Sequence, residues 1–217
     1  MNCYSWMDSV FGRVLITGDG EAVSGLFLGP WEEGEEIKQD RNNTEHTLHK
    51  QGGANASGIF GHHVSGKLPS AYNKLYKEPF TQEKDAFSKA KEELRAYWAG
   101  RLKRFTVPLI VQGTAFQMSV WEVLRGIPFG RWISYGDVAN KLGRPGAVRA
   151  VGGAIGRNPV SIIIPCHRVL GSRGQLTGFG GGLEKKAGLL KHEGLHPEPA
   201  AQLRDRRVTA GRATIGV

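Results

Sequence analysis

The residues of this chain best able to do covalent chemistry stand side by side, a cysteine at position 166 and a histidine at 167. They follow Ile162–Ile164, a β-branched run that predicts a short buried strand, and Pro165, which cannot donate to a sheet ladder. The chain should therefore turn at Pro165 and leave the Cys166 thiol at the edge of a packed core, where it can meet a ligand. A buried structural cysteine beside a surface histidine is the alternative, because free cysteine is among the most buried residue types.

The number of cysteines and the length of the apolar runs indicate in which cellular compartment this thiol is found. The chain has two cysteines, Cys3 and Cys166, too few for a disulfide framework. Residues 1–9 include Asp8 and lack the apolar core of a signal peptide. No run approaches the roughly 18 apolar residues of a membrane helix. We therefore expect no membrane association and a cytoplasmic location, or a nuclear one in a eukaryote, where Cys166 stays a thiol.

Charge is distributed unevenly along the 217 residues, whose formal net charge is +9. Residues 1–100 hold 11 Lys/Arg and 14 Asp/Glu, whereas residues 101–195 hold 14 Lys/Arg and 4 Asp/Glu. A basic half joined to a mildly acidic half indicates that one part of the protein meets a polyanion. A generic basic surface is the alternative.

The first half of the chain predicts a small α/β domain over residues 1–105, with an antiparallel sheet and one helix. Residues 10–28 alternate as two strands around Gly18-Asp19-Gly20, a strong hairpin signal. Residues 82–99 carry apolar side chains at helical spacing and end at Gly100. Residues 106–110 then predict a strand that leads into the basic half.

An insertion at about residues 32–75 is expected to be a long, mobile loop, because it is rich in polar residues and glycine. His46, His49, His62 and His63 lie in it. They could hold a metal, but there is no companion cysteine cluster, and solvated loop histidines are the more ordinary interpretation.

The second half, residues 106–195, predicts a mostly α-helical domain. One helix runs from about 114 to 125, a second begins after Ser134 as N-cap, and a third spans about 146–156. The last two, joined by a tight turn, have the layout of a helix-turn-helix, for which an ordinary helix pair is the alternative. Residues 196–217 are expected to be a disordered basic tail.

The third of these helices contains almost only small residues and one arginine, Arg149. A helix that reads the major groove needs several long polar side chains, which this one lacks. Small residues instead allow a backbone to lie against a narrow minor groove, and a lone arginine there could fill the gap left by an extruded nucleotide. Packing against another helix, with Arg149 solvated, is equally compatible with the pattern.

Several motifs within residues 80–195 together resemble the methylated-DNA–protein-cysteine methyltransferases, also called O6-alkylguanine-DNA alkyltransferases. The segment Ile164–Val169 is similar to their active-site motif. Other matching segments, in the same order and spacing, are Gly113–Gln117, Val120-Trp121, Ile127–Gly130, Ser134–Asp137, Arg149–Ala154, Asn158-Pro159 and Leu189–Gly194. The hairpin at 10–28 is compatible with the α/β N-terminal domain of that family.

The resemblance implies that Cys166 takes an alkyl group from the O6 atom of guanine in duplex DNA. His167 and Glu193 resemble the other members of a Cys-His-Glu relay, with a water between thiol and imidazole. Tyr135 is similar to the tyrosine that crowds the phosphate 3′ of the target nucleotide and helps to rotate it. Asn158 is similar to the asparagine that ties the recognition helix to the active-site turn.

The same resemblance implies a DNA-binding face and an alkyl pocket. Arg149 is similar to the arginine finger that replaces the extruded guanine, and the other DNA contacts implied are Ser134, Tyr135, Ala147, Ala150, Gly152 and Ser172. The pocket wall is implied to be Val169, Phe179, Gly180 and Gly181. Some members have tyrosine and serine where this chain has Phe179 and Gly180, so the glycine-rich segment suggests room for alkyl groups larger than methyl.

The implied partner is double-stranded DNA containing O6-alkylguanine, with O4-alkylthymine as a further candidate substrate, and the expected protein is a monomer. Some members hold zinc through two N-terminal cysteines, but this chain has only Cys3 there, so no metal and no cofactor are expected.

The expected chemistry is an attack at saturated carbon, which needs a thiolate and hence a base. The product is a thioether that water does not hydrolyse, so each molecule should react once.

Three alternatives remain at this point. An alkyltransferase-like protein can bind damage without chemistry, although such proteins usually lack the cysteine. A cysteine hydrolase could use Cys166, His167 and Glu193, but it leaves the small-residue helix without a purpose. A DNA-binding regulator could use methylation of Cys166 as a signal, but no second regulatory domain is visible in the sequence.

Overall fold

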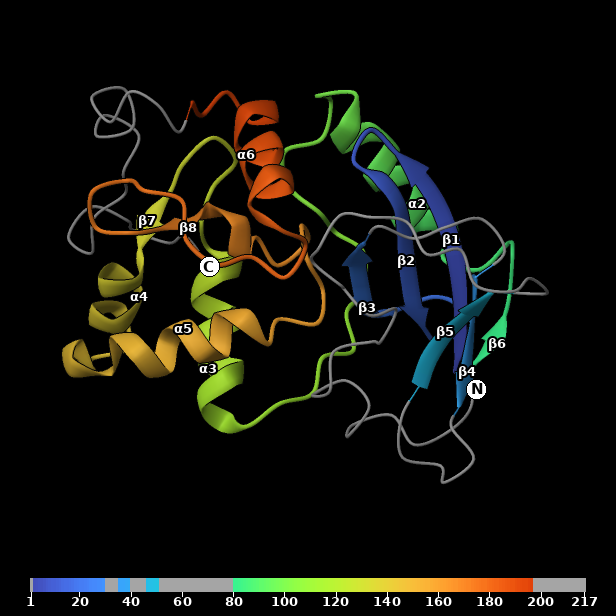
Figure 1. The fold of residues 1–217 in the computed structure, drawn as a ribbon, viewed down its shortest axis with the longest axis horizontal. Helices are drawn as coiled ribbons and strands as arrows, with labels where there is room; N and C mark the ends of the chain where they lie inside the picture. The colour runs from blue at the N-terminus through green and yellow to red at the C-terminus, as the bar shows by residue number, and fades with distance from the viewer. Residues whose placement is uncertain (1, 30–34, 40–45, 51–79, 197–217) are drawn as a thin grey trace, which may run out of the picture.

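The computed structural model describes residues 2–29, 35–39, 46–50 and 80–196. A sheet with one helix occupies one side of the molecule, and four helices occupy the other (Figure 1). The small sheet and the helical second half agree with the predicted order of the two parts.

The sheet is built from β1 (Cys3–Ser9), β2 (Gly12–Gly18), β3 (Val23–Leu28) and β6 (Thr81–Gln82), in the order β3-β2-β1-β6. The predicted hairpin corresponds to β2 and β3, and its turn is stabilised by Asp19, whose carboxylate accepts from the backbone N–H groups of residues 21 and 22. β1 has no counterpart among the predicted strands. The predicted antiparallel sheet is instead mixed, because β6 runs parallel to β1.

Helix α2 (Ser88–Trp98) begins six residues later than the predicted start at position 82. Two effects delay it: Thr81–Gln82 is taken into the sheet as β6, and Phe87 adopts a left-handed φ of 64°. The helix ends as predicted before Gly100, which has a φ of 71°. Its apolar face is buried and includes Tyr97.

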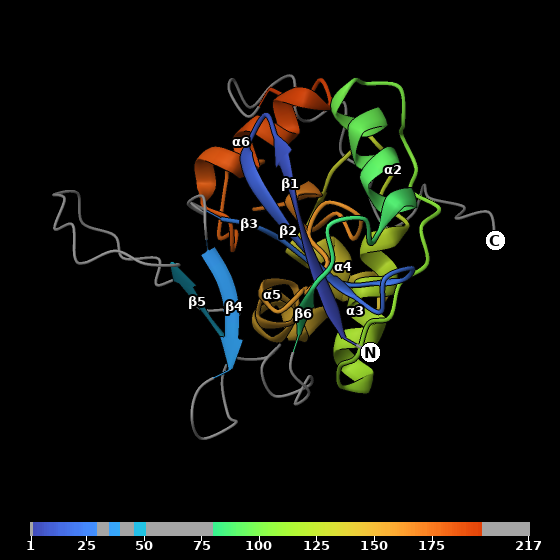
Figure 2. The ribbon, with the colours of Figure 1, turned by 90° about the vertical axis from the view of Figure 1, so that its right-hand side faces the viewer.

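The predicted loop at about 32–75 is wrong in part, since it contains an antiparallel hairpin. Strand β4 (Glu35–Gln39) pairs with β5 (His46–Lys50), and this hairpin lies to one side of the main sheet (Figure 2). His46 and His49 belong to β5. His62, His63, most of the remaining insertion and the tail from residue 197 lie outside the described residues.

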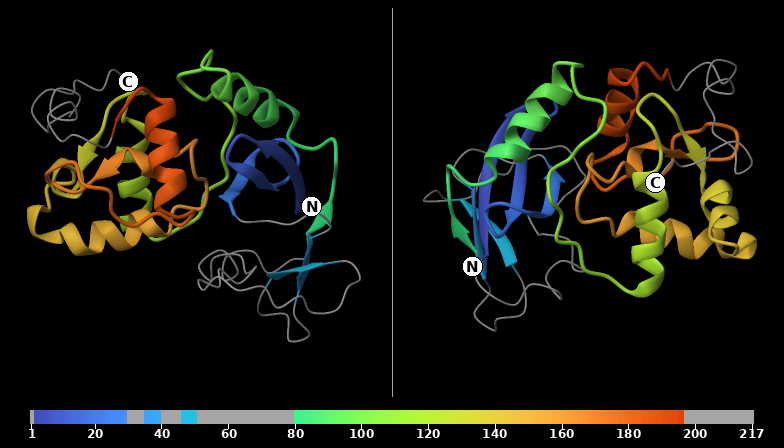
Figure 3. Two further views of the ribbon diagram at one scale, coloured as in Figure 1. Left: turned by 45° about the horizontal axis from the view of Figure 1, so that its top comes forward. Right: turned by 180° about the vertical axis from the view of Figure 1, so that it is seen from behind.

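The second half contains α3 (Ala115–Arg125), α4 (Tyr135–Lys141), α5 (Val148–Gly156) and α6 (Leu183–His192). A 3-10 turn, η1 (Pro145–Ala147), leads into α5, which runs across α3 (Figures 1 and 3). Capping boxes begin both α3 and α4, the second with the predicted pair Ser134 and Asp137. A short parallel pair that was not predicted joins β7 (Ile133–Ser134) to β8 (Val169–Leu170).

The two halves share one core, joined along β3. Val23 exchanges backbone hydrogen bonds with residues 108 and 110, which reduces the strand predicted at 106–110 to a single bridge between Val23 and Leu109. Leu26 pairs in the same way with residues 159 and 161, just before the Cys166 turn. The edge of the N-terminal sheet therefore supports the segment that carries the thiol.

Within the described ranges, no helix has the length and apolar content needed to cross a bilayer.

Candidate active site

The Cys166 turn differs from the prediction in one respect. Ile162–Ile164 are buried, as expected, but they form a turn rather than a strand, because Ile162 adopts a left-handed φ of 73°. That conformation is unusual for a β-branched residue and persists only where the surrounding structure enforces it. After Pro165 the chain enters a 3-10 turn, η2 (Cys166–Arg168), so the predicted bend at Pro165 is confirmed.

Asn158 holds this turn in place. It follows the C-terminal end of α5, its side-chain oxygen accepts from the Val160 N–H at 3.1 Å, and its amide nitrogen donates to the Ile164 carbonyl at 2.8 Å. The side chain thereby connects α5 to the backbone just before the thiol. This is the connection that the family resemblance implied for Asn158.

Cys166 is buried, with 6% of the residue exposed, so it is less open than the predicted position at the edge of the core. Burial raises the pKa of the thiol, while side-chain hydrogen bonds from Asn158 and Ser161 and the positive charge of Lys186 oppose that rise. At neutral pH the group is a thiol, so a nearby base is needed to make the nucleophilic thiolate.

His167, the next residue in the chain, can supply that base. Its side chain is completely buried, and Nε2 lies 2.9 Å from Oε1 of Glu193. Because an ionised carboxylate can only accept hydrogen bonds, Nε2 must carry the proton, which leaves a lone pair on Nδ1. This buried Nδ1 has no hydrogen-bond partner within the described part of the chain. Burial lowers the pKa of His167 against the opposing effect of Glu193, so the imidazole is neutral and able to accept a proton.

Glu193 is the most densely hydrogen-bonded carboxylate of the site. Besides His167, it accepts from Arg168 through both Nε and Nη2 at 2.8 Å, from the Tyr97 hydroxyl at 2.8 Å and from the Gly130 N–H at 3.1 Å. Burial alone would raise the pKa of Glu193, but its hydrogen bonds and charge interactions with His167 and Arg168 hold that pKa well below its usual range. The carboxylate is therefore charged and balanced by Arg168.

Sequence reasoning missed Arg168, Tyr97 and Lys186 as members of this site. Arg168 had a signal, because it belongs to the matching motif. Lys186 had one too, since it lies three and four residues before Leu189 and Leu190, on the apolar face of α6. The sequence pattern around Tyr97 predicts only an aromatic residue on the buried face of a helix, and it gives no sign of a contact with Glu193.

Lys186 is fully buried and fastens two segments next to the thiol. Its ammonium group donates to the Val169 carbonyl and to the Thr177 carbonyl, each at 2.7 Å. Burial lowers the pKa of Lys186 to about 8, while the neighbouring Cys166 opposes the shift. The Cys166 turn and the glycine-rich segment that starts near Thr177 are thus held by one cation.

Tyr135, the first residue of α4, joins the helical face to this centre. Its hydroxyl accepts from the Thr177 hydroxyl at 3.2 Å, and its ring lies close to Gly152 of α5. Burial raises the pKa of Tyr135, and the nearby Cys166 adds to that rise, so the phenol stays protonated and can serve as a donor.

The residues implied for the alkyl pocket lie in and beyond the Cys166 turn. Val169 is buried and Phe179 is half-buried against the core. A side chain at Gly181 would meet the Phe179 ring and the Leu28 carbonyl of β3, whereas one at Gly180 would meet open space. The wall is therefore closed at Gly181 and open at Gly180.

The residues implied for DNA binding fall into two groups. Arg149, Ala150 and Ser172 are exposed, and Ala147 and Gly152 are half-buried. Ser134, in contrast, is buried, and its hydroxyl is engaged with Asp137 in the cap of α4. Its side chain positions Tyr135 and is not available to a phosphate.

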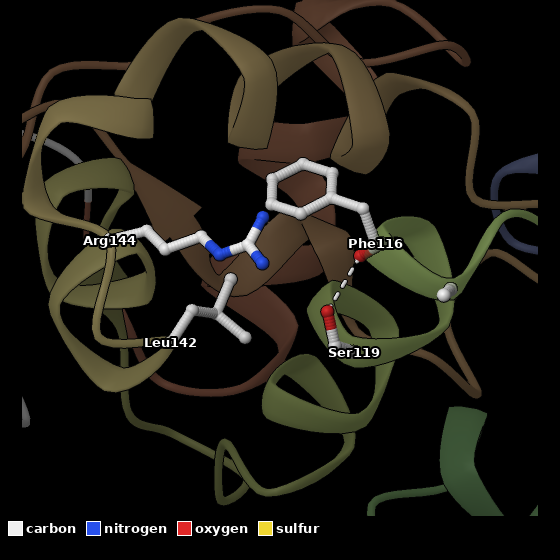
Figure 4. Close-up of a pocket in the computed structure, with 5 residues that line it drawn as sticks. Phe116, Ser119, Leu142 and Arg144 are labelled. Carbon is white, nitrogen blue, oxygen red and sulfur yellow. Dashed lines mark hydrogen bonds between the residues drawn. The ribbon is translucent and has the colours of Figure 1, made fainter.

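A cavity of about 520 Å³ lies elsewhere, beside the turn that precedes α5 (Figure 4). It is lined by Ala115, Phe116, Ser119, Leu142 and Arg144, with the Arg144 guanidinium 5.7 Å from the centre of the Phe116 ring. Since none of the residues around Cys166 lines it, this cavity is separate from the site described above.

Comparison with known proteins gives consistent results. A family model described as the DNA-binding domain of 6-O-methylguanine DNA methyltransferase matches residues 115–195. The methylated-DNA–protein-cysteine methyltransferase of Mycobacterium bovis is 52% identical over 114 residues, which cover 52% of this chain and 69% of that protein.

Solved structures agree over a longer part of the chain. The Mycobacterium tuberculosis O6-methylguanine methyltransferase superposes with a TM-score of 0.65 at 35% identity, covering 89% of this chain and 93% of that one. The OGT of M. tuberculosis in complex with DNA has a TM-score of 0.65 at 33% identity, covering 94% and 99%. His167, the residue after Cys166, is hydrogen-bonded to Glu193, and with these similarities the chain belongs to the methylated-DNA–protein-cysteine methyltransferase family.

Proposed function

We propose that this protein repairs DNA by transferring an alkyl group from the O6 atom of guanine in a duplex to the Sγ atom of Cys166. The observation that carries the proposal is the buried side chain of His167, the residue after Cys166, with Nε2 bonded to Glu193 and Nδ1 left without a partner in the described residues. This arrangement provides a neutral base, already in the tautomer that a thiol needs.

In the proposed reaction, Nδ1 of His167 takes the thiol proton through a bridging water, and Glu193 stabilises the imidazolium that forms. The thiolate attacks the alkyl carbon, so that a carbon–sulfur bond forms as the carbon–oxygen bond to guanine breaks. The Tyr135 hydroxyl, which lies near Cys166, donates one proton to the leaving guanine, and the proton that His167 took from the thiol then restores the Tyr135 phenol, so that overall one proton passes from the thiol to guanine. Because the thioether has no group that water can attack, each molecule acts once.

DNA would be bound by α4 and α5, which we propose to act as a helix-turn-helix with α5 in the minor groove. Arg149 and Ala150 are exposed on α5, and Tyr135 connects this face to the thiol. The target base must leave the stack, at a cost of a few kcal/mol, before its O6 substituent can reach Cys166. Arg149 would occupy the space that it leaves.

We also propose that the protein acts as a monomer, with residues 1–105 supporting a DNA-binding and transfer domain at 106–195. The proposed roles of the two domains are supported by β3, which is hydrogen-bonded to residues 108–110 and 159–161. Through these bonds the N-terminal domain supports the segment that carries the thiol.

The test is intact-mass spectrometry after incubation with a duplex containing O6-methylguanine. We expect a gain of one methyl group per chain, located at Cys166, and no further turnover. Cys166→Ala should bind the duplex and gain nothing. Repeated turnover without an added acceptor, or methylation elsewhere, would contradict the proposal.

The role of Arg149 is tested by comparing two substrates. Arg149→Ala should slow transfer from the duplex at least tenfold while leaving transfer from a free O6-alkylguanine base nearly unchanged, because only the duplex requires base extrusion. Equal slowing of both reactions would rule out the extrusion role.

A further inference from the structure

Tyr97 brings a hydroxyl group from the N-terminal half of the chain to the carboxylate behind His167. It lies in the last turn of α2, and its hydroxyl donates to Oε1 of Glu193 at 2.8 Å. Oε1 is also the atom that accepts from Nε2 of His167 at 2.9 Å and from Nη2 of Arg168 at 2.8 Å. Because both groups bond to Oε1, losing the Tyr97 hydroxyl would change the negative charge on the atom that the His167 imidazole contacts.

The Tyr97 hydroxyl can act only as a donor toward Glu193. The residue is fully buried, and burial, together with the charge of Glu193 and the hydrogen bond to it, raises the pKa of Tyr97 far above its ordinary value. Its ring is held by aromatic neighbours, with the His192 and Trp98 rings 4.9 Å away and the Phe105 ring 5.4 Å away. The Tyr97 hydroxyl therefore stays protonated over the working pH range, and the packing of the ring keeps it directed toward Glu193.

The negative charge on Oε1 of Glu193 affects how readily His167 takes up a proton. Each donor on Oε1 withdraws negative charge from it and weakens the stabilisation that Glu193 can give to an imidazolium at His167. We infer that Tyr97 is a positioning residue that lowers the basicity of His167, so that the imidazole remains neutral and ready to take the proton of the Cys166 thiol. The inference rests on the proposed alkyl transfer and adds a residue from outside the matched DNA-binding domain.

If Tyr97 serves only to pack the core, removing its hydroxyl should have a different effect. A tyrosine that only fills the core would change the stability of the protein when its hydroxyl is removed, but not the pH at which His167 titrates. The pH profile therefore separates the two roles. Since His167 must be neutral to accept a proton, the transfer rate falls on the acidic side of its pKa, and a higher pKa moves that limb to higher pH.

The experiment measures single-turnover methyl transfer against pH for Tyr97→Phe, which keeps the ring and removes the hydroxyl. We expect the acidic limb to move up by about half to one pH unit, and the rate on that limb to fall about three- to tenfold. Tyr4→Phe is the matched control, because the buried Tyr4 also loses one side-chain hydrogen bond, to Gln82 at 3.2 Å, and lies outside the Glu193 network.

A second variant tests the effect of the Tyr97 hydroxyl on His167 if Tyr97→Phe does not fold. 3-Fluorotyrosine at position 97 keeps the shape and is a stronger donor, so it should move the acidic limb to lower pH. Imidazole nitrogen NMR of His167 should show the same two shifts in the absence of DNA. If the His167 titration coincides in wild type and in the variant that folds, the inference is wrong. If wild type takes up no methyl group while His167 shifts as expected, only the proposed function fails.

Discussion

Lys186 shows how one buried cation can serve both structure and reactivity. Its ammonium group joins the Val169 and Thr177 carbonyls and lies near Cys166, whose negative charge it would stabilise after proton loss. Because burial lowers its pKa to about 8, it is charged at neutral pH and loses that charge within an accessible range. Its support for the thiolate should therefore depend on pH.

Lys186→Met is expected to slow methyl transfer about tenfold or more at pH 7, where the wild-type lysine is charged. Above pH 8 the wild-type lysine becomes neutral, so the ratio of wild-type to variant rates should shrink as pH rises through that value. Single-turnover rates from pH 6.5 to 9.5 measure this ratio. Lys185→Met, at the neighbouring position on α6, is the control. A ratio that does not change with pH would show that Lys186 acts through structure alone.

The tip of the β1–β2 hairpin packs on α6, the helix that carries Lys186 and leads into Glu193. A methyl group added at Gly188 of α6 would lie 2.4 Å from Cε1 of Phe11, and the Phe11 ring itself lies 5.3 Å from that of Trp98. The glycine is thus needed for close approach of the hairpin rather than for an unusual backbone angle. The contact connects the N-terminal sheet to α6.

Gly188→Ala should destabilise the protein by about 1–3 kcal/mol, because the Phe11 ring must move within a packed contact. In a Phe11→Ala background the same change should be neutral or stabilising, since alanine favours helix over glycine by up to about 1 kcal/mol. Chemical denaturation of the four proteins gives the coupling directly. Gly156→Ala, where an added methyl group meets open space, is the control. Equal costs in both backgrounds would show that Phe11 is not what the glycine accommodates.

The basic charge of the protein is carried by the half that contains α4 and α5. Residues 101–195 carry 14 Lys/Arg against 4 Asp/Glu. Cations on such a surface bind phosphates largely without regard to sequence and release counterions when they do so. A repair protein that must find rare damage would use this weak, general attraction to sample DNA.

Binding to undamaged duplex should therefore weaken steeply with salt, and Arg144→Ala should reduce the slope of log affinity against log salt by about 1. Arg144 is exposed in the turn before α5. Arg125→Ala is the control, since Arg125 is paired with Glu122 at 3.2 Å and should leave the slope unchanged. Fluorescence anisotropy at several salt concentrations measures both. An unchanged slope for Arg144→Ala would place the phosphate contacts elsewhere.

Features that depend on neighbouring residues could be predicted from the amino-acid sequence alone. The Gly-Asp-Gly hairpin, the cap of α4 at Ser134, the end of α2 before Gly100 and the bend at Pro165 follow from the conformations that these residues prefer, and all four are present. The resemblance in the second half also named His167 and Glu193 next to Cys166, and the structure brings His167 and Glu193 into contact.

Features that depend on contacts between distant residues became known from the folded chain. Ile162–Ile164 became a turn because Asn158 and β3 satisfy the neighbouring backbone, and β6 formed because its pairing with β1 joins residues about 78 positions apart. Tyr97 reaches Glu193 across 96 positions. Periodicity reports which face of an element is buried, but not which buried hydroxyl meets which carboxylate, since that depends on how two elements pack.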